Sequence, residues 1–163
     1  CVDQVCPPNP DVRERKPLLL KIAPDLSDDG IDAAVDVALE TGCDGIIATN
    51  TSIGRAGLAT APVRIAQIGA GGLSGRPVRE RSTVVLARVA RRLDRRLPVI
   101  GVGGIDSAEA AWEKIVHGAS LVQVYTGFIY AGPSLARVIN QGLLLRLEQH
   151  GLSAIPEAIG RSL

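Results

Sequence analysis

The sequence predicts an α/β fold of four parallel strand–helix units, the C-terminal half of a (β/α)8 TIM barrel. Four short apolar runs alternate with longer segments of helical periodicity, an order typical of strands joined by crossover helices. Each run is apolar at consecutive positions, as expected of parallel strands buried on both faces. Eight units need about 250 residues, so 163 residues hold half a barrel. Glycine turns after the last two runs indicate the C-terminal half, where barrels bind phosphate.

The first unit follows a proline-rich segment, residues 1–17, which we predict to be a loop. Residues 18–23 form a short apolar run that a proline closes, and this predicts a buried strand. Ser27 is expected to cap the next helix, and Gly42 to end it. We assign residues 18–163 to one partial barrel domain.

The other units repeat this order along the chain. The predicted strands are 45–49, 99–102 and 121–125, and the predicted helices are 77–96, 108–117, Pro133 to about Gly151, and a short one after Ile155. Either Asp106 or Ser107 is expected to cap the helix at 108–117. No Gly-x-Gly-x-x-Gly signature opens the first helix, which argues against a dinucleotide-binding fold. A long loop runs from about Asn50 to Arg76. Loops of this length are usually functional or disordered.

Composition argues against a nucleic-acid partner, because the net charge is +1 and only 2% of the residues are aromatic. A basic run, Arg88, Arg91, Arg92, Arg95 and Arg96, lies opposite an apolar stripe at helical spacing. We interpret the run as a solvated helix face, and an anion-binding patch is the alternative.

The three cysteines, Cys1, Cys6 and Cys43, lack metal-ligand spacing, so we expect a reducing compartment and no structural metal. Cys43 is expected to be a small buried thiol. No apolar run reaches the roughly twenty residues of a membrane span, and no signal peptide is recognisable. The sequence starts at Cys1 and contains no methionine, which favours a piece of a longer protein.

Polar residues at the carboxyl ends of barrel strands indicate an active site. Lys21 interrupts an apolar strand, and we interpret it as facing an anionic ligand, because an unpaired buried ammonium is costly. A snorkelling lysine is the alternative. Thr49, Asn50 and Thr51 follow the second strand, where a polar turn is the alternative to a ligand-binding cluster. The Asn50 amide suits a ligand ring with alternating C=O and N–H groups.

Two glycine turns follow the last two strands. In the first, Gly101, Gly103 and Gly104 are expected to let a ligand approach the backbone, next to the N–H groups of a helix start. The second turn contains Tyr125 and Thr126. Each turn alone is explained by a tight loop, whereas one phosphate held between them accounts for both.

Several motifs resemble, in order and spacing, those of the quinone-dependent class (class 2) of dihydroorotate dehydrogenase. They are LKIAPDLS (20–27), IATNTS (47–52), GGLSGRPVRERST (71–83), VIGVGGIDS (99–107), ASLVQVYTGFIYAGP (119–133) and IPEAIG (155–160). The resemblance covers nearly everything after about Pro17, and KIAPDL favours the quinone-dependent class over the soluble one.

The resemblance implies an FMN enzyme that oxidises dihydroorotate to orotate in de novo pyrimidine (UMP) biosynthesis, with a quinone as electron acceptor. It implies a peripheral position on the cytoplasmic side of the inner membrane. It implies that orotate is contacted by Asn50 and Thr51, and FMN by Lys21, Thr49, Gly75, Gly104, Tyr125 and Thr126. In this interpretation Lys21 lies against the flavin ring, and the last three residues hold the phosphate.

We expect no catalytic residue in this chain. The resemblance implies that the general base, a serine, lies on a loop upstream of Lys21, and the sequence contains no such loop. Ser27, Ser52 and Ser74 belong to other motifs. The amino-terminal helices that form the quinone tunnel are also absent from the sequence. We therefore expect no turnover of dihydroorotate by this chain alone, and self-association or pairing with an amino-terminal half, since a half barrel has two open edges.

Two alternative functions stay open at this point. Another flavin-dependent TIM-barrel oxidoreductase would keep both glycine turns but would give no reason for Lys21 and Asn50 together. A non-catalytic module that binds FMN or phosphate would account for the absent base.

Overall fold

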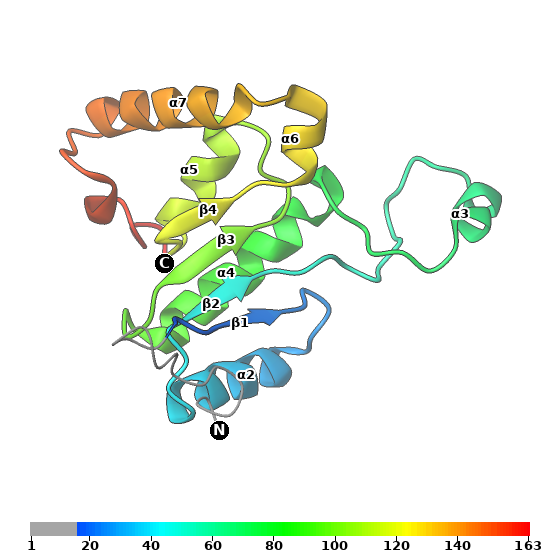
Figure 1. Ribbon diagram of the computed structural model, residues 1–163, viewed down its shortest axis with the longest axis horizontal. Coiled ribbons are helices and arrows are strands. Elements are labelled where there is room, and N and C mark those ends of the chain that lie inside the picture. Colours follow the sequence, from blue (N-terminus) through cyan, green and yellow to red (C-terminus); the bar gives the residue numbers. More distant parts are fainter. Residues whose placement is uncertain (1–15) are drawn as a thin grey trace.

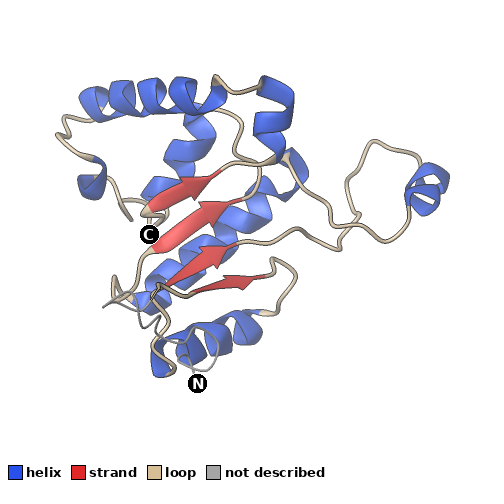
Figure 2. Ribbon diagram, in the orientation of Figure 1, coloured by secondary structure: helices blue, strands red, loops and turns tan. Residues whose placement is uncertain are grey.

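A parallel four-stranded sheet lies at the centre of the computed structural model, which describes residues 16–163 (Figures 1 and 2). The strands lie side by side in chain order. They are β1 (Leu19–Ile22), β2 (Gly45–Ala48), β3 (Val99–Val102) and β4 (Leu121–Gln123). The prediction of an α/β fold with four parallel strand–helix units is therefore confirmed.

Four long helices follow the strands as predicted. They are α2 (Asp28–Glu40), α4 (Arg79–Leu93), α5 (Ala108–Val116) and α7 (Leu135–Gln149). The hydroxyl oxygen of Ser27 accepts a hydrogen bond from the Gly30 N–H at 3.2 Å and so caps α2. Ser107, rather than Asp106, caps α5 by the same kind of bond. The start of α4 follows a short 3-10 turn, Arg76–Val78, and a second such turn, Ile155–Glu157, lies near the C-terminus.

Two short helices were not predicted. The helix α3 (Pro62–Ile68) lies within the stretch predicted as a loop, and Figure 1 shows it far from the sheet. None of its residues is buried, and the proline at its start is a local feature that favours a helix. The helix α6 (Thr126–Ala131) directly follows the shortened β4 and also has no buried residue.

The helices α2, α4 and α5 pack against one face of the sheet, and α7 packs on α5. Ile22, Ile46 and Val99 on this face form the main core with residues of α2 and α4, and a second cluster joins α5 to α7. On the other face, the strand register places Lys21, Ile47, Ile100 and Leu121 in one row. Lys21 is exposed there, and Leu121 is 62% exposed.

The prediction that every strand is buried on both faces is therefore wrong for the described residues. The face opposite the helices is the one that would line the interior of a closed barrel. Apolar residues on both faces of a strand predict that both faces can be buried. Each face is buried only where another element packs against it. Gln123 on β4 is exposed on that face for the same reason.

The arginine run was predicted as a solvated helix face, and this is confirmed for Arg91, Arg92, Arg95 and Arg96, which are exposed, whereas Arg88 is half-buried. Arg88 donates two hydrogen bonds of 2.7 Å to Asp32 on α2 and a third, of 2.8 Å, to Asp28. Arg92 pairs with Asp36 at 2.6 Å. Paired carboxylates on the neighbouring helix leave neither arginine available as an anion patch, and the two helices are held together along this edge.

No helix within residues 16–163 is long and apolar enough to cross a membrane. In the same part of the chain no group of three or more acidic, histidine or cysteine residues is placed to hold a metal ion. Cys43 is a free, half-buried thiol that packs against the main core. The predictions for Cys1, Cys6 and most of the loop segment 1–17 fall outside the described residues.

Candidate functional site

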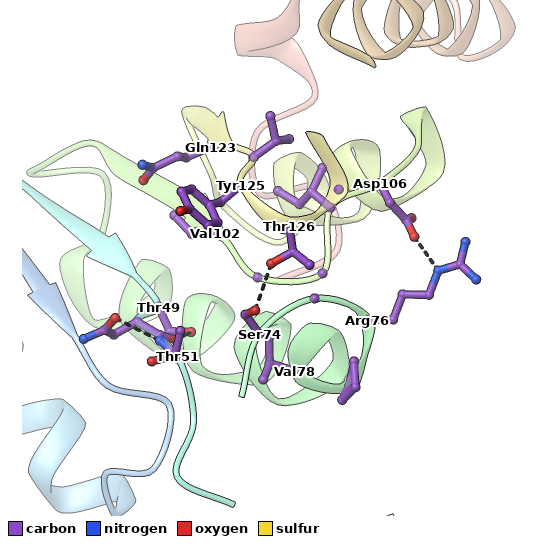
Figure 3. Close-up of a pocket in the computed structure, with 18 of the residues that line it drawn as sticks. Thr49, Thr51, Ser74, Arg76, Val78, Val102, Asp106, Gln123, Tyr125 and Thr126 are labelled. Carbon is purple, nitrogen blue, oxygen red and sulfur yellow. Dashed lines mark hydrogen bonds and ion pairs between the residues drawn. The ribbon is translucent and has the colours of Figure 1, made fainter. Parts of the chain in front are cut away.

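A cavity of about 740 Å³ opens at the carboxyl ends of the four strands (Figure 3). Its size falls in the range of small-molecule sites. All of the residues predicted to contact a ligand line it, although they come from four strands and a loop. These residues are Lys21, Thr49, Asn50, Thr51, Gly75, Gly104, Tyr125 and Thr126. The structure thus brings the predicted residues together, while their individual roles stay predictions.

Lys21 lies at one side of the cavity, next to the last residue of β1. Its side chain is exposed, so the expectation of a buried ammonium is wrong for this structure. The open sheet face is the reason, because nothing described packs against this row of the sheet. No ion pair or hydrogen bond of the Lys21 ammonium occurs within residues 16–163, and the cavity therefore contains an uncompensated positive charge at this point.

The three polar residues after β2 form an irregular segment at the cavity wall. The backbone N–H of Asn50 donates to the carbonyl of Ile22 at 2.7 Å, which ties this segment to β1. The buried Thr49 hydroxyl donates to the Asn50 carbonyl, and the Thr51 N–H donates to Asn50 Oδ1, both at 2.9 Å. The structure assigns no turn to these three residues, so the alternative of a polar turn is wrong, although two of the side chains bond to neighbouring backbone groups. The Nδ2 group of Asn50 has no protein partner among the described residues, and its side chain is exposed toward the cavity.

The first glycine turn needs glycine for two reasons. Gly103 and Gly104 have φ of +117° and +70°, the left-handed region that other residues avoid. A Cβ on Gly104 would lie 2.4 Å from the Arg79 Cβ, and one on Gly103 would lie 2.6 Å from the Ser82 Oγ. The missing side chains therefore face α4 and not a ligand, which corrects the predicted reason. Gly101 is similar, with Leu86 2.9 Å from the position of its Cβ.

This glycine turn presents backbone N–H groups to the cavity. The N–H groups of Gly103 and Gly104 have no hydrogen-bond partner among residues 16–163, and both residues line the cavity. Backbone N–H groups in such a turn bind anions. Because the turn is seated directly on the first turn of α4, these donors are held in place without a ligand.

The second glycine turn packs onto the first one. A Cβ on Gly127 would lie 2.3 Å from the carbonyl oxygen of Ile105 and 3.1 Å from the Cα of Asp106. Only glycine allows the two loops to approach this closely. Thr126 beside it donates a hydrogen bond from its hydroxyl to Ser74 Oγ at 2.9 Å, and Gly75 contacts the Thr126 side chain (Figure 3). Three loops therefore meet at one corner of the cavity.

Arg76 and Asp106 form an ion pair at the rim of the cavity (Figure 3). The hydrogen bond to Asp106 raises the pKa of Arg76, so the guanidinium stays charged. The pairing compensates its charge, and Lys21 is left as the cation without a carboxylate partner in the described cavity wall.

Sequence reasoning missed five polar lining residues: Ser74, Arg76, Asp106, Gln123 and Tyr130. Arg76 and Asp106 lie within two of the motifs quoted above, but they are 30 residues apart, and no spacing rule joins them. Gln123 carried a usable signal, since it is a polar residue inside an apolar strand run, as Lys21 is.

The family model described as dihydroorotate dehydrogenase matches residues 6–147. Two similar curated proteins are both described as dihydroorotate dehydrogenase (quinone). The one from Rhodococcus opacus (strain B4) is 56% identical over 88% of this chain and 40% of its own length. The one from Thermobifida fusca (strain YX) is 54% identical over 88% of this chain and 38% of its own length. The chain thus spans about 40% of the length of such relatives.

A solved structure has the same arrangement of elements. It is the crystal structure of DHODH from Eimeria tenella in complex with ferulenol, with a TM-score of 0.84 and 40% identity. The match covers 91% of this chain and 39% of that one.

Proposed function

The chain belongs to the dihydroorotate dehydrogenase family, and from this premise we propose that its cavity holds FMN beside dihydroorotate or orotate. In the longer protein the site would serve the oxidation of dihydroorotate to orotate, in pyrimidine biosynthesis, with a quinone as electron acceptor. The observation that carries the proposal is the meeting of Lys21, Asn50 and the glycine turn at Gly103–Gly104 in one cavity.

The two glycine turns fit the phosphate end of FMN. The free N–H groups of Gly103 and Gly104 would donate to phosphate oxygens, and Tyr125 and Thr126 would close the other side. The close contact at Gly127 keeps the two turns at one corner, so that a single phosphate can reach both. Backbone N–H groups suit this role because they remain hydrogen-bond donors at any physiological pH and cannot rotate away from the phosphate as a side chain can.

The uncompensated charge of Lys21 fits the ring end. When bound, FMN supplies the acceptor for the hydride that leaves dihydroorotate. Lys21 would place its ammonium where negative charge accumulates, a stabilisation that requires no reorganisation because the charge is already in position. A paired lysine could not act in this way, and Lys21 has no carboxylate partner among the described residues. Thr49 and Gly75 would contact the flavin between the ring and the phosphate.

Asn50 and Thr51 would orient the substrate. Asn50 Nδ2 is an exposed donor, and Oδ1 keeps one lone pair after it accepts the Thr51 N–H. An amide with a free donor and a free acceptor can pair with the C=O and N–H groups of an orotate-like ring. The bond to Thr51 also fixes the rotation of the amide, so the donor and acceptor are held in one orientation.

The general base and the quinone site would lie in parts of the enzyme outside this sequence. This proposal is supported by the share of about 40% that the chain covers in its relatives, and by the cavity wall, where Ser74 is the serine present and its hydroxyl oxygen accepts from Thr126. Peripheral association with the membrane is proposed for the longer protein in the same way.

A titration in two steps tests the proposed function. FMN is added to the chain, and orotate is then added while the absorption spectrum of the bound flavin is recorded. We expect orotate to shift the flavin spectrum of the unchanged chain. Asn50→Ala should retain FMN binding and lose the orotate shift, whereas Asn140→Ala, at an exposed position on α7, should behave like the unchanged chain.

Three outcomes would contradict this assignment. An orotate shift of equal size in Asn50→Ala would remove Asn50 from the substrate site. Bleaching of FMN by dihydroorotate on this chain alone would show that a base is present within the sequence. Absence of any orotate shift in the unchanged chain, with FMN bound, would favour another flavin-dependent oxidoreductase or a non-catalytic module.

A further inference from the structure

Lys114 is a fully buried lysine that the proposed function does not use. It lies on α5 and is 0% exposed. Its ammonium donates three hydrogen bonds, to the Arg79 carbonyl at 3.0 Å and to Ser82 Oγ and Thr83 Oγ1 at 2.6 Å each. A buried amino group needs hydrogen-bond partners, and Lys114 has three of them.

The three acceptors all belong to the first turn of α4, and this is the turn on which Gly103 and Gly104 are seated. Ser82 Oγ lies 3.2 Å from the Gly103 carbonyl and 2.9 Å from the Arg79 carbonyl, so its one O–H is shared between them, and this hydroxyl joins the Lys114 ammonium to the glycine turn. The connection runs from the Lys114 ammonium through the Ser82 hydroxyl to the Gly103 carbonyl.

Two more contacts hold the same junction from α5. Gly101, in β3 just before the turn, leaves room for the Lys114 Cβ, which lies 3.1 Å from the position that a Cβ on Gly101 would take. The neighbouring residue Glu113 accepts a hydrogen bond from Arg79 Nε at 2.8 Å. Two consecutive residues of α5 therefore hold Arg79, one through its backbone and the other through its side chain, and Arg79 is the residue against which Gly104 packs.

We propose that Lys114 is a positioning residue for the anion-binding turn. Its ammonium fixes the first turn of α4 and, through Ser82, the carbonyl of Gly103, so that the backbone donors of Gly103 and Gly104 stay in place at the cavity. The part of this inference that concerns a bound phosphate rests on the proposed function, and the part that concerns the turn does not.

A purely structural role of Lys114 leads to a different expectation. Lys114 would then contribute to the contact between α4 and α5, and any loss of that contact would lower stability without a specific effect on the turn. Thr83 separates the two cases. It is a partner of the same ammonium at the same distance as Ser82, but no hydrogen bond joins it to the glycine turn.

The test uses the full chain and nitrogen-15 relaxation of its backbone amides. In the unchanged chain we expect order parameters of about 0.85 at Gly103 and Gly104, the value of rigid backbone. Lys114→Met, of similar length and without a charge, should lower them below about 0.6, into the flexible range. Ser82→Ala should do the same, and Thr83→Val should leave them unchanged. If Lys114→Met fails to fold, Ser82→Ala carries the comparison.

A second measurement compares the dissociation constants of FMN and riboflavin, which lacks the phosphate. Lys114→Met and Ser82→Ala should weaken FMN binding at least tenfold and leave riboflavin binding within twofold, whereas Thr83→Val should change neither. Equal losses for both ligands, or rigid glycine amides in Ser82→Ala and Lys114→Met, would overturn the positioning role. An unchanged chain that binds no FMN would refute the proposed function, and the relaxation data alone would then decide the role of Lys114.

Discussion

Replacing Gly104 with alanine tests how firmly the anion-binding turn is seated on α4. Gly104 has φ of +70°, and Gly42, at the end of α2, has the same value. An alanine Cβ at position 104 would lie 2.4 Å from the Arg79 Cβ and 2.8 Å from its Cα, whereas one at position 42 would meet nothing within 4 Å. Gly42→Ala is therefore a control with the same backbone strain and no steric overlap.

The expected magnitudes follow from this difference. A left-handed alanine costs about 1–2 kcal/mol, and the loss of glycine freedom in the unfolded chain returns roughly 0.4–1 kcal/mol. Gly42→Ala should therefore lower the free energy of unfolding by roughly 0–1.6 kcal/mol. Overpacking against backbone adds about 1–3 kcal/mol, so Gly104→Ala should lose roughly 1–4.6 kcal/mol. Gly104 contacts Arg79 backbone atoms, which cannot rotate away.

Equilibrium unfolding in urea measures both variants under the same conditions. The difference between them isolates the contact with Arg79, because strain and unfolded-state effects are shared. Equal losses in the two variants would refute the close seating of the turn, and with it the physical basis for preformed phosphate donors. A larger loss in Gly42→Ala would refute it equally.

The remaining predictions concern three charged residues outside the ligand contacts. Burial lowers the pKa of Lys114 to about 7. Between about pH 7 and 10 the unfolded chain therefore binds more protons than the folded chain, and the free energy of unfolding rises with pH by up to about 1.4 kcal/mol per pH unit. Urea unfolding at several pH values should show this slope in the unchanged chain and not in Lys114→Met. Asp25 accepts from Ser52 Oγ at 2.6 Å at the base of the long loop, and this bond is the largest cause of the lowered pKa of its carboxyl. Asp25→Ala should speed proteolysis within residues 53–72, and an unchanged cleavage rate would contradict the anchoring role. Arg88→Gln should lower the melting temperature at low salt and less so at high salt, since its pair with Asp32 is half-exposed; a salt-independent change would argue against the ion pair.

The sequence predicted the strands and long helices well, because their signals are local. The capping bonds at Ser27 and Ser107 were readable in the same way, since each serine precedes a helical apolar stripe. The helix α3 could not be read, because none of its residues is buried. The pairing of Arg88 with Asp32 needed the distance between two helices, which no single segment encodes.

In the candidate site, too, local features were predictable from the sequence and features that depend on distant elements were not. The positions of Lys21 and the residues after β2 were predictable, since strand ends of a parallel sheet meet at one edge. The exposure of Lys21 was not, because it depends on what covers the sheet face and not on β1 itself. The reason for the glycines was also misread, since the missing side chains face Arg79 and Ser82. Lys114 had a usable signal, because it falls within the apolar stripe of its helix beside Ala110 and Ala111.

The central claim is that the cavity holds FMN with its phosphate on the two glycine turns. The most direct measurement compares the dissociation constants of FMN and riboflavin for this chain by fluorescence, in the unchanged protein and in Gly104→Ala. The account predicts that FMN binds at least tenfold more tightly than riboflavin, and that Gly104→Ala removes most of this difference while riboflavin binding stays within twofold. Equal affinities for the two flavins in the unchanged chain would contradict it.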